Sequence, residues 1–314
     1  MKIAIVGAGS MGCLYGGLLA KAGEDVWLVG KRREVVEAIN GRGVSLCLPD
    51  GSEETVPVMA TAEVKQIGIA DLVLFLVKSG DTVEAARGAL PMVGPETYAM
   101  TLQNGIGNGE AIERELGMDR VIYGMSLLGA SSVGPGRVKV ATPPSSSTMV
   151  WIGAKRDFPM LRKVAEVLTR AGIRTEVSQE IHRVIWTKLP LACGMGTLTA
   201  LTRIRVGDLL AQEEGRELLR LVATECVQVA NRKGIGLEIE EVMDLLFATG
   251  GSIPGHVSSM LGSVLKRKRT EIDGLNQALA SEAERLGVPA PVNRTLALLV
   301  RIIERTYDRQ LGLA

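Results

Sequence analysis

The chain has 314 residues, 46% of them hydrophobic and 23% charged, a balance that predicts a globular protein of two domains. A formal net charge of +1 and an aromatic content of 3% argue against nucleic acid or an anionic membrane as a partner. The four cysteines and two histidines lack metal-ligand or disulfide spacing, and we recognise no signal peptide or membrane span, so we expect no metal site and a cytoplasmic protein.

The first half alternates strand-like and helix-like segments. We expect strands at residues 3–6, 25–29, 72–77, 98–102 and 121–128, and a helix at 11–22 that ends at Gly23. The run at 72–77 is continuously apolar, as in a strand that helices cover on both faces. This alternation predicts an α/β fold, a doubly wound and mostly parallel sheet of the Rossmann type.

Residues 134–153 have a different pattern. Gly134-Pro135-Gly136 is turn chemistry, and two strand-like runs, 138–141 and 148–152, flank the loop 143–147. We expect the two runs to form an antiparallel hairpin at the edge of the sheet.

Helical spacing of apolar residues dominates the second half, at 209–232, 238–248, 257–265, 271–286 and 295–307. We therefore expect a dinucleotide-binding Rossmann domain at 1–178 and an all-α substrate and catalytic domain at 179–314. The apolar helix faces fit either a homodimer or an ordinary core, and the sequence does not separate the two.

A glycine-rich segment, Gly7-Ala8-Gly9-Ser10-Met11-Gly12, follows the first strand and opens the first helix. In this context G-x-G-x-x-G predicts dinucleotide binding, because glycines let the backbone approach a pyrophosphate at a helix N-terminus. A structural glycine turn without a ligand is the alternative.

The end of the second strand discriminates between the nicotinamide cofactors. NAD enzymes usually carry an acidic residue there, whereas this chain has Lys31 and Arg32 after Gly30. Cationic groups pair with a 2′-phosphate, so we predict NADP(H) rather than NAD(H). The alternative is that these charges only solvate the start of the next helix.

Six motifs in order resemble those of one family, ketopantoate reductase (2-dehydropantoate 2-reductase), over essentially the whole chain. Besides the glycine segment they are Lys78, Gln103-Asn104-Gly105, Trp186-Thr187-Lys188-Leu189, Ser258-Ser259-Met260-Leu261 and Thr270-Glu271-Ile272-Asp273. The resemblance implies an NADP-dependent oxidoreductase that reduces 2-dehydropantoate to pantoate in pantothenate biosynthesis.

The same resemblance implies roles for single residues. Lys188 and Glu271 would be catalytic, and an ammonium group can both stabilise and protonate the alkoxide that hydride transfer leaves. Ser259 would bind the substrate, and Asn104 and Lys78 would lie at the nicotinamide end or the substrate. For Glu271 a helix capping box, Thr270 with Asp273, is an alternative that is compatible with catalysis.

The chain departs from the family pattern after the lysine. Ala192 and Gly196 stand where ketopantoate reductases typically carry asparagines, one and two helical turns on, and His256 stands where another asparagine is frequent. Residues four apart share a helix face, so this face has lost two amides, although Pro190 makes a regular helix less secure here. His256 could replace a lost substrate contact or have no role in the site.

Three functions therefore stay open on the sequence. The first is ketopantoate reduction. The second is NADPH-dependent reduction of a bulkier or more apolar 2-oxo acid, because a less polar pocket discriminates against added methylenes only weakly. The third is a dinucleotide-binding sensor with little turnover.

Overall fold

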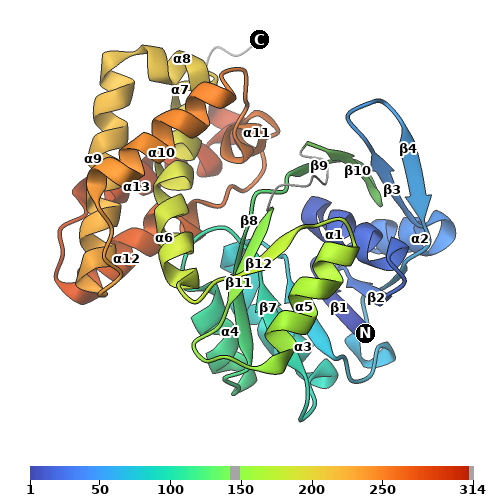
Figure 1. The fold of residues 1–314 in the computed structure, drawn as a ribbon. Coiled ribbons are helices and arrows are strands. Elements are labelled where there is room, and N and C mark those ends of the chain that lie inside the picture. Colours follow the sequence, from blue (N-terminus) through green and yellow to red (C-terminus); the bar gives the residue numbers. More distant parts are fainter. Residues whose placement is uncertain (142–148, 311–314) are drawn as a thin grey trace. The chain divides into compact units, whose positions relative to one another are not determined.

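The computed structural model describes residues 1–141 and 149–310 (Figure 1). Contacts between Cα atoms divide the chain into two compact units, and each has a hydrophobic core of its own. The first unit comprises Met1–Gln103 and Asn108–Ile181. The second comprises Asn104–Gly107 and His182–Ala314.

The first unit is built on a sheet of eight strands in the order β12-β11-β8-β7-β6-β1-β2-β5. The pairings from β5 to β8 are all parallel, and β11 is antiparallel to β8. The predicted strands of the first half are therefore confirmed as the centre of a parallel sheet. The strands are β1 (Lys2–Val6), β2 (Asp25–Val29), β5 (Met59–Thr61), β6 (Leu72–Phe75), β7 (Tyr98–Thr101), β8 (Val121–Ser126), β11 (Val150–Gly153) and β12 (Thr175–Val177).

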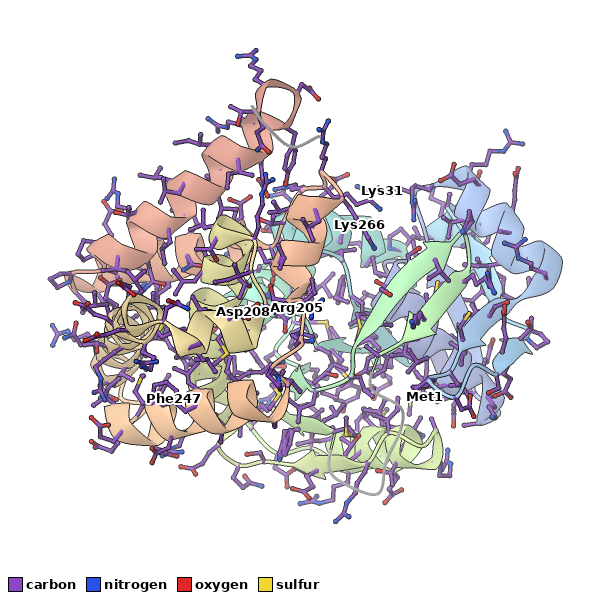
Figure 2. The ribbon with its side chains drawn as sticks, turned by 90° about the horizontal axis from the view of Figure 1, so that it is seen from above. Met1, Lys31, Arg205, Asp208, Phe247 and Lys266 are labelled. Carbon is purple, nitrogen blue, oxygen red and sulfur yellow. The ribbon has the colours of Figure 1, made fainter. Side chains whose placement is uncertain are left out.

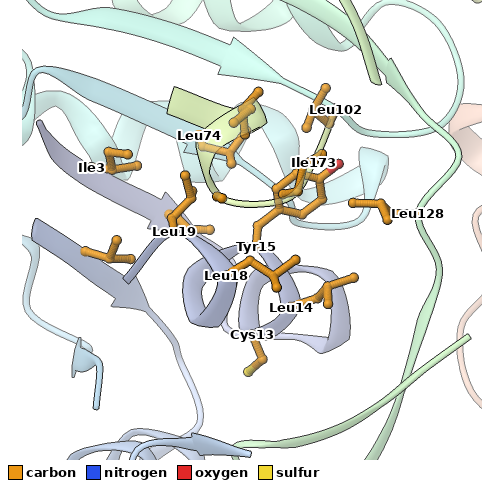
Figure 3. Packing of buried hydrophobic residues seen from close by; sticks show 14 of the residues in the cluster. Ile3, Cys13, Leu14, Tyr15, Leu18, Leu19, Leu74, Leu102, Leu128 and Ile173 are labelled. Carbon is orange, nitrogen blue, oxygen red and sulfur yellow. The ribbon is translucent and has the colours of Figure 1, made fainter. Parts of the chain in front are cut away.

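Helices cover both faces of this sheet, as its central strands require. Ile3 and Leu74 point into a core with α1 (Ser10–Lys21) and α5 (Pro159–Arg170), part of which Figure 3 shows. Phe75 is also fully buried but belongs to the other face, where α3 (Thr82–Ala89) and α4 (Asn108–Leu116) pack on each other and on β6, β7 and β8. A strand buried on both faces has no polar alternation, which explains its continuously apolar sequence.

A second sheet, β4-β3-β10-β9, packs on α1. Its strands are β3 (Val44–Cys47), β4 (Glu53–Val56), β9 (Ala130–Gly134) and β10 (Arg137–Val140), and α2 (Arg33–Arg42) precedes β3. The predicted hairpin is wrong, because β10 pairs with β9 and β3 here while β11 joins the large sheet. The Gly134-Pro135-Gly136 turn instead connects β9 to β10, and the loop 143–147 lies outside the described residues.

The described part of the second unit contains helices and connecting loops but no strand. Two predicted helices are interrupted: the one at 209–232 breaks at Gln212, and the one at 271–286 begins with a short 3-10 turn, Ile272–Gly274. The helices are α6 (Ile181–Pro190), α7 (Thr197–Thr202), α8 (Val206–Ala211), α9 (Glu213–Arg232), α10 (Ile239–Ser252), α11 (Ser259–Leu265), α12 (Asn276–Leu286) and α13 (Pro291–Arg305), with a π-helical segment, Leu191–Gly196, between α6 and α7.

One helical run qualifies the expectation that no segment is long and apolar enough to span a membrane. Ile181–Thr202 reaches that threshold by length and composition, with a mean hydropathy of 1.3. Within this run 56% of the window is buried in the protein, and core helices of soluble proteins pass the same test.

Candidate functional site

The glycine segment forms a tight turn between β1 and α1, and its glycines have distinct local roles. Gly7 has a φ of +118°, and an added Cβ there would lie 2.9 Å from the backbone of Leu76. A Cβ on Gly12 would overlap the carbonyl oxygen of Gly7, so this position too requires glycine. Gly9 differs, because it is exposed and a Cβ there would meet no atom within 4 Å. The open approach to the turn is therefore at Gly9.

The first turn of α1 has the properties of an anion site. Its N-cap, Gly9, offers no side-chain cap, and no acidic residue lies in the first turn. The N–H groups of Ser10, Met11 and Gly12 have no acceptor inside the helix, and they lie at its positive end. This donor set fits a dinucleotide pyrophosphate, which needs several backbone N–H groups and close approach.

Two cations follow β2, where the sequence predicts recognition of a 2′-phosphate. Lys31, labelled in Figure 2, donates to Glu84 of α3 at 2.6 Å, and both side chains are exposed. Arg32 lies 3.5 Å from Glu34. Exposed ion pairs of this kind contribute only about 0–1 kcal/mol, so Glu84 holds Lys31 weakly against a doubly charged competitor.

In the second unit three of the predicted residues lie together. The Lys188 ammonium at the end of α6 donates to Asn104 Oδ1 at 3.4 Å, and Asn104 Nδ2 donates to Glu271 Oε2 at 3.4 Å. Burial lowers the pKa of Lys188 to about 8, although the Glu271 carboxylate acts in the opposite direction. The neutral amide thus links a cation of lowered pKa to a carboxylate.

The Asn104–Gly107 loop is held against the turn that carries Glu271. Ile106 N–H donates to the Gly274 carbonyl at 3.3 Å. Gly105 has a φ of +90°, and a Cβ there would lie 1.9 Å from the Gly274 oxygen. Only glycine permits this approach, which accounts for the glycine that follows Asn104.

The segment after Lys188 is π-helical, and this changes the face on which its residues lie. A π turn takes about 4.4 residues and an α turn 3.6. Residues four apart are therefore rotated about the helix axis in opposite directions in the two kinds of helix, and where one follows the other the rotations largely cancel. Ala192 and Gly196 therefore follow Lys188 along one face more closely than in a regular α-helix. A Cβ on Gly196 would meet no atom within 4 Å, although Gly196 is buried. This face thus presents small apolar groups beside open space.

The sequence interpretation did not include Asn276, which supports this π-helical segment. Its buried amide donates to the Cys193 carbonyl and to Asn293, and it accepts from Thr197 at 2.7 Å. An asparagine at the start of a helix reads as an ordinary cap, so the sequence carries no signal for this long-range contact.

The other predicted residues lie on other segments of the chain. Ser259 is exposed at the first turn of α11, and its neighbour Ser258 is the buried N-cap that accepts from Leu261 N–H. His256 is exposed, and its carbonyl accepts from Val206 N–H. Lys78 is half-buried, in the first unit, at the end of the run that contains β6.

The expected capping box at Thr270 is wrong. Thr270 Oγ1 accepts from Ile272 N–H, but Asp273 does not cap and instead pairs with Arg301 and Arg269. Only the 3-10 turn Ile272–Gly274 starts at this point, and α12 begins at Asn276. Among residues 1–141 and 149–310 no group of three or more His, Cys, Asp or Glu side chains is placed to hold a metal ion.

Comparison with known proteins gives concordant matches over both units. The family model "Ketopantoate reductase PanE/ApbA" matches residues 3–155, and the model of that family's C-terminal part matches residues 180–304. A 2-dehydropantoate 2-reductase of Pyrococcus horikoshii is 34% identical over 304 residues, which cover 97% of this chain and 98% of the relative.

Two solved structures are similar over nearly the whole chain. A PanE/ApbA family ketopantoate reductase from Ralstonia eutropha is 33% identical with a TM-score of 0.89, covering 98% of this chain and 100% of that one. A ternary structure of D-mandelate dehydrogenase with NADH and anilino(oxo)acetate is 25% identical with a TM-score of 0.90, covering 99% and 100%. From these matches and the residues described above, the chain belongs to the ketopantoate reductase family.

Proposed function

We propose that the protein reduces a 2-oxo acid to the 2-hydroxy acid with NADPH, as a 2-dehydropantoate 2-reductase. The observation that carries the proposal is the hydrogen-bonded series Lys188–Asn104–Glu271. Membership of the family and its 2-dehydropantoate 2-reductase relatives support the same activity.

Each residue of this series has a chemical task. NADPH, when bound, supplies a hydride to the C2 carbonyl carbon of the substrate. The carbonyl electron pair then becomes an alkoxide on oxygen, which the Lys188 ammonium stabilises and protonates. Asn104 holds the ammonium by its amide oxygen, and Glu271 favours the charged form of Lys188. Lys188 Nζ thus serves the reacting oxygen, while Asn104 Nδ2 donates to Glu271 and the Glu271 carboxylate favours the protonated lysine.

The residues of the first unit would hold the dinucleotide. The turn formed by Gly7, Ala8, Gly9, Ser10, Met11 and Gly12 would bind the pyrophosphate, with Lys78 nearer the nicotinamide end. Lys31 and Arg32 would pair with the 2′-phosphate, which supports NADP(H) over NAD(H).

Replacement of both Lys31 and Arg32 by alanine tests this preference. We expect the dissociation constant for NADPH to rise by about tenfold to a hundredfold, because two charge-assisted contacts are lost, with little change for NADH. An unchanged NADPH affinity would contradict the assignment.

A second substrate class is favoured by the face after Lys188. Ala192 and Gly196 offer no polar side chain, and the space beside Gly196 would admit a larger apolar substituent at C3 of the 2-oxo acid. The similar D-mandelate dehydrogenase structure, with anilino(oxo)acetate, supports this alternative. A Gly196→Asn variant should lower kcat/KM for the apolar substrate more than for ketopantoate.

The experiment that tests the proposed function measures NADPH oxidation with ketopantoate beside larger 2-oxo acids. Turnover of ketopantoate supports the pantothenate enzyme, and turnover of a larger 2-oxo acid alone supports the second class. Bound NADPH without turnover on any 2-oxo acid would contradict both and favour a dinucleotide-binding sensor.

Ser259 would bind the substrate by family resemblance, and His256 would replace the substrate contact of the asparagine that is frequent at its position in the family. The pathway would be pantothenate biosynthesis, and a cytoplasmic location is supported by four cysteines that are all free thiols. The exposed apolar side chains Leu298 and Ile302 of α13 support a homodimer, which sedimentation would test.

A further inference from the structure

The C-terminal helix makes three contacts with the segment that carries Glu271. The Tyr307 hydroxyl, just after α13, donates to the Lys268 carbonyl at 2.9 Å. Glu304 accepts from Thr270 N–H at 2.5 Å. Arg301 Nε donates to Asp273 Oδ1 at 3.0 Å. Arg301 and Glu304 are three residues apart and share one face of α13, and Tyr307 follows in the 3-10 turn Tyr307–Arg309.

Glu271, in the same segment, has a partner outside α13 and its extension. Within residues 268–273, backbone groups of Lys268 and Thr270 and the side chain of Asp273 are bound to α13 and its extension. Glu271 instead accepts from Asn104. The segment thus has one set of groups that fixes it and one carboxylate that it presents to the Lys188 series.

The Arg301–Asp273 contact is the strongest of the three. Arg301 bonds Asp273 through two nitrogens and reaches Gln277 of α12 with the third at 3.0 Å. Arg269 bonds the other Asp273 oxygen at 3.0 Å. Burial opposes ionisation of Asp273, but the two guanidinium groups prevail and lower its pKa. Charge-assisted bonds with this many partners fix a side chain more firmly than a neutral contact does.

We propose that Arg301, Glu304 and Tyr307 are positioning residues for Glu271 and set its placement against Asn104 and Lys188. They bond to the 268–273 segment, and their effect on Glu271 is transmitted through it. The expected loss of kcat rests on the proposed function, whereas the expected change in the pKa of the Lys188 ammonium does not. Arg269 and Arg301 both face Asp273, so Glu271 is the charged side chain of the segment that acts on Lys188.

The test is a double-mutant cycle in the full-length protein with Arg301→Met and Glu271→Gln. Arg301→Met should lower kcat by about tenfold to a hundredfold, because small displacements of catalytic groups have effects of this size. In the double variant it should add almost nothing to the loss that Glu271→Gln causes alone. The dissociation constant for NADPH should stay at its wild-type value, and Arg301→Lys, which keeps the charge but not the planar set of donors, should lose less kcat than Arg301→Met.

A second readout is independent of turnover. The pKa of Lys188, followed by nitrogen NMR of its ammonium, should fall in Arg301→Met and in Tyr307→Phe because the Glu271 charge is less well placed. Arg220→Met is the matched control, since Arg220 makes a two-nitrogen pair with Glu240 on another part of the helical unit. It should leave both kcat and the Lys188 pKa unchanged.

The results separate this inference from the proposed function. The positioning role would be overturned if the losses of kcat in Arg301→Met and Glu271→Gln multiply in the double variant. It would also be overturned if folded Arg301→Met and Tyr307→Phe keep the wild-type pKa of Lys188. If Arg301→Met does not fold, Tyr307→Phe and Arg301→Lys decide by the same readouts. A wild-type protein that turns over no 2-oxo acid would refute the proposed function, while the NMR measurement would still decide whether these residues place Glu271.

Discussion

Lys188 is held as a cation in a place that disfavours charge, and this predicts how the reaction depends on pH. Burial brings its pKa from the ordinary 10.5 down to about 8. In the proposed function the ammonium is the proton donor, so kcat for reduction should be constant below about pH 8 and fall as pH rises through it. A Lys188→Arg variant should lack this basic limb, because a guanidinium stays charged. A profile that is flat from pH 7 to 10 in the wild type would contradict the role of Lys188.

Burial of the charged Lys188 should also lower the free energy of unfolding. With a folded pKa of about 8 against 10.5 unfolded, the unfolded chain binds more protons between these values, so stability rises with pH across that window. Below it the full cost of the buried charge is present. Lys188→Met should therefore raise the free energy of unfolding at pH 7 by about 1–3 kcal/mol. Urea unfolding measures this, and Lys163→Met, at an exposed position, should show no such gain.

Gly105 and Gly107 form a matched pair for testing the loop that bears Asn104. Both have positive φ, +90° and +82°, but only a Cβ on Gly105 meets an atom, the Gly274 oxygen at 1.9 Å. Gly107→Ala should cost only backbone strain, about 1 kcal/mol. Gly105→Ala should cost about 2 kcal/mol or more and lower kcat as well, because Asn104 must move. Equal losses of stability in the two variants, measured by thermal unfolding, would contradict the close approach described.

At the scale of the elements, the end of α11 carries a strain that a substitution can relieve. Arg267 follows the helix with a φ of +50°, a conformation that favours glycine. Its side chain is exposed, so Arg267→Gly should stabilise the protein by about 0.5–1 kcal/mol. Arg203 has a similar φ of +59° but also donates to Gln310, so Arg203→Gly should gain less. A destabilised Arg267→Gly variant would show that the arginine contributes more than its backbone strain.

The elements differ in how far the sequence determines them. β2 matches its expected residues because an apolar run bounded by charge and glycine is a local signal. The prediction of a hairpin at 138–152 was wrong because the local sequence indicates a strand but not the strand with which it pairs. β10 pairs with β3, almost a hundred residues earlier in the chain. The break of the 271–286 helix likewise comes from contacts with α13, which periodicity does not reveal.

The candidate site shows the same division. The glycine turn is contiguous, so spacing alone predicts it. Asn104, Lys188 and Glu271 are distant in sequence, and only family resemblance singled them out before their hydrogen bonds were seen. Asn276 and Arg301 have no local signal, because a buried amide and a half-buried arginine acquire their roles from the packing around them.

At the scale of the whole molecule, each of the two units contributes different chemical groups. The parallel sheet of the first unit supplies backbone donors at the start of α1 and two cations after β2, which suits a dinucleotide. The helical unit supplies the lysine, amide and carboxylate that suit reduction of a carbonyl. In the proposed function these groups together make a 2-oxo acid reductase whose proton donor is Lys188.

The most direct measurement of this claim is kcat for NADPH oxidation with a 2-oxo acid in the wild type and in Lys188→Ala, alongside the dissociation constant for NADPH. We predict that kcat falls by about 10²–10⁴-fold in the variant, the usual contribution of a positioned acid, while NADPH binds as before. A Lys188→Ala enzyme that keeps the wild-type kcat would contradict it.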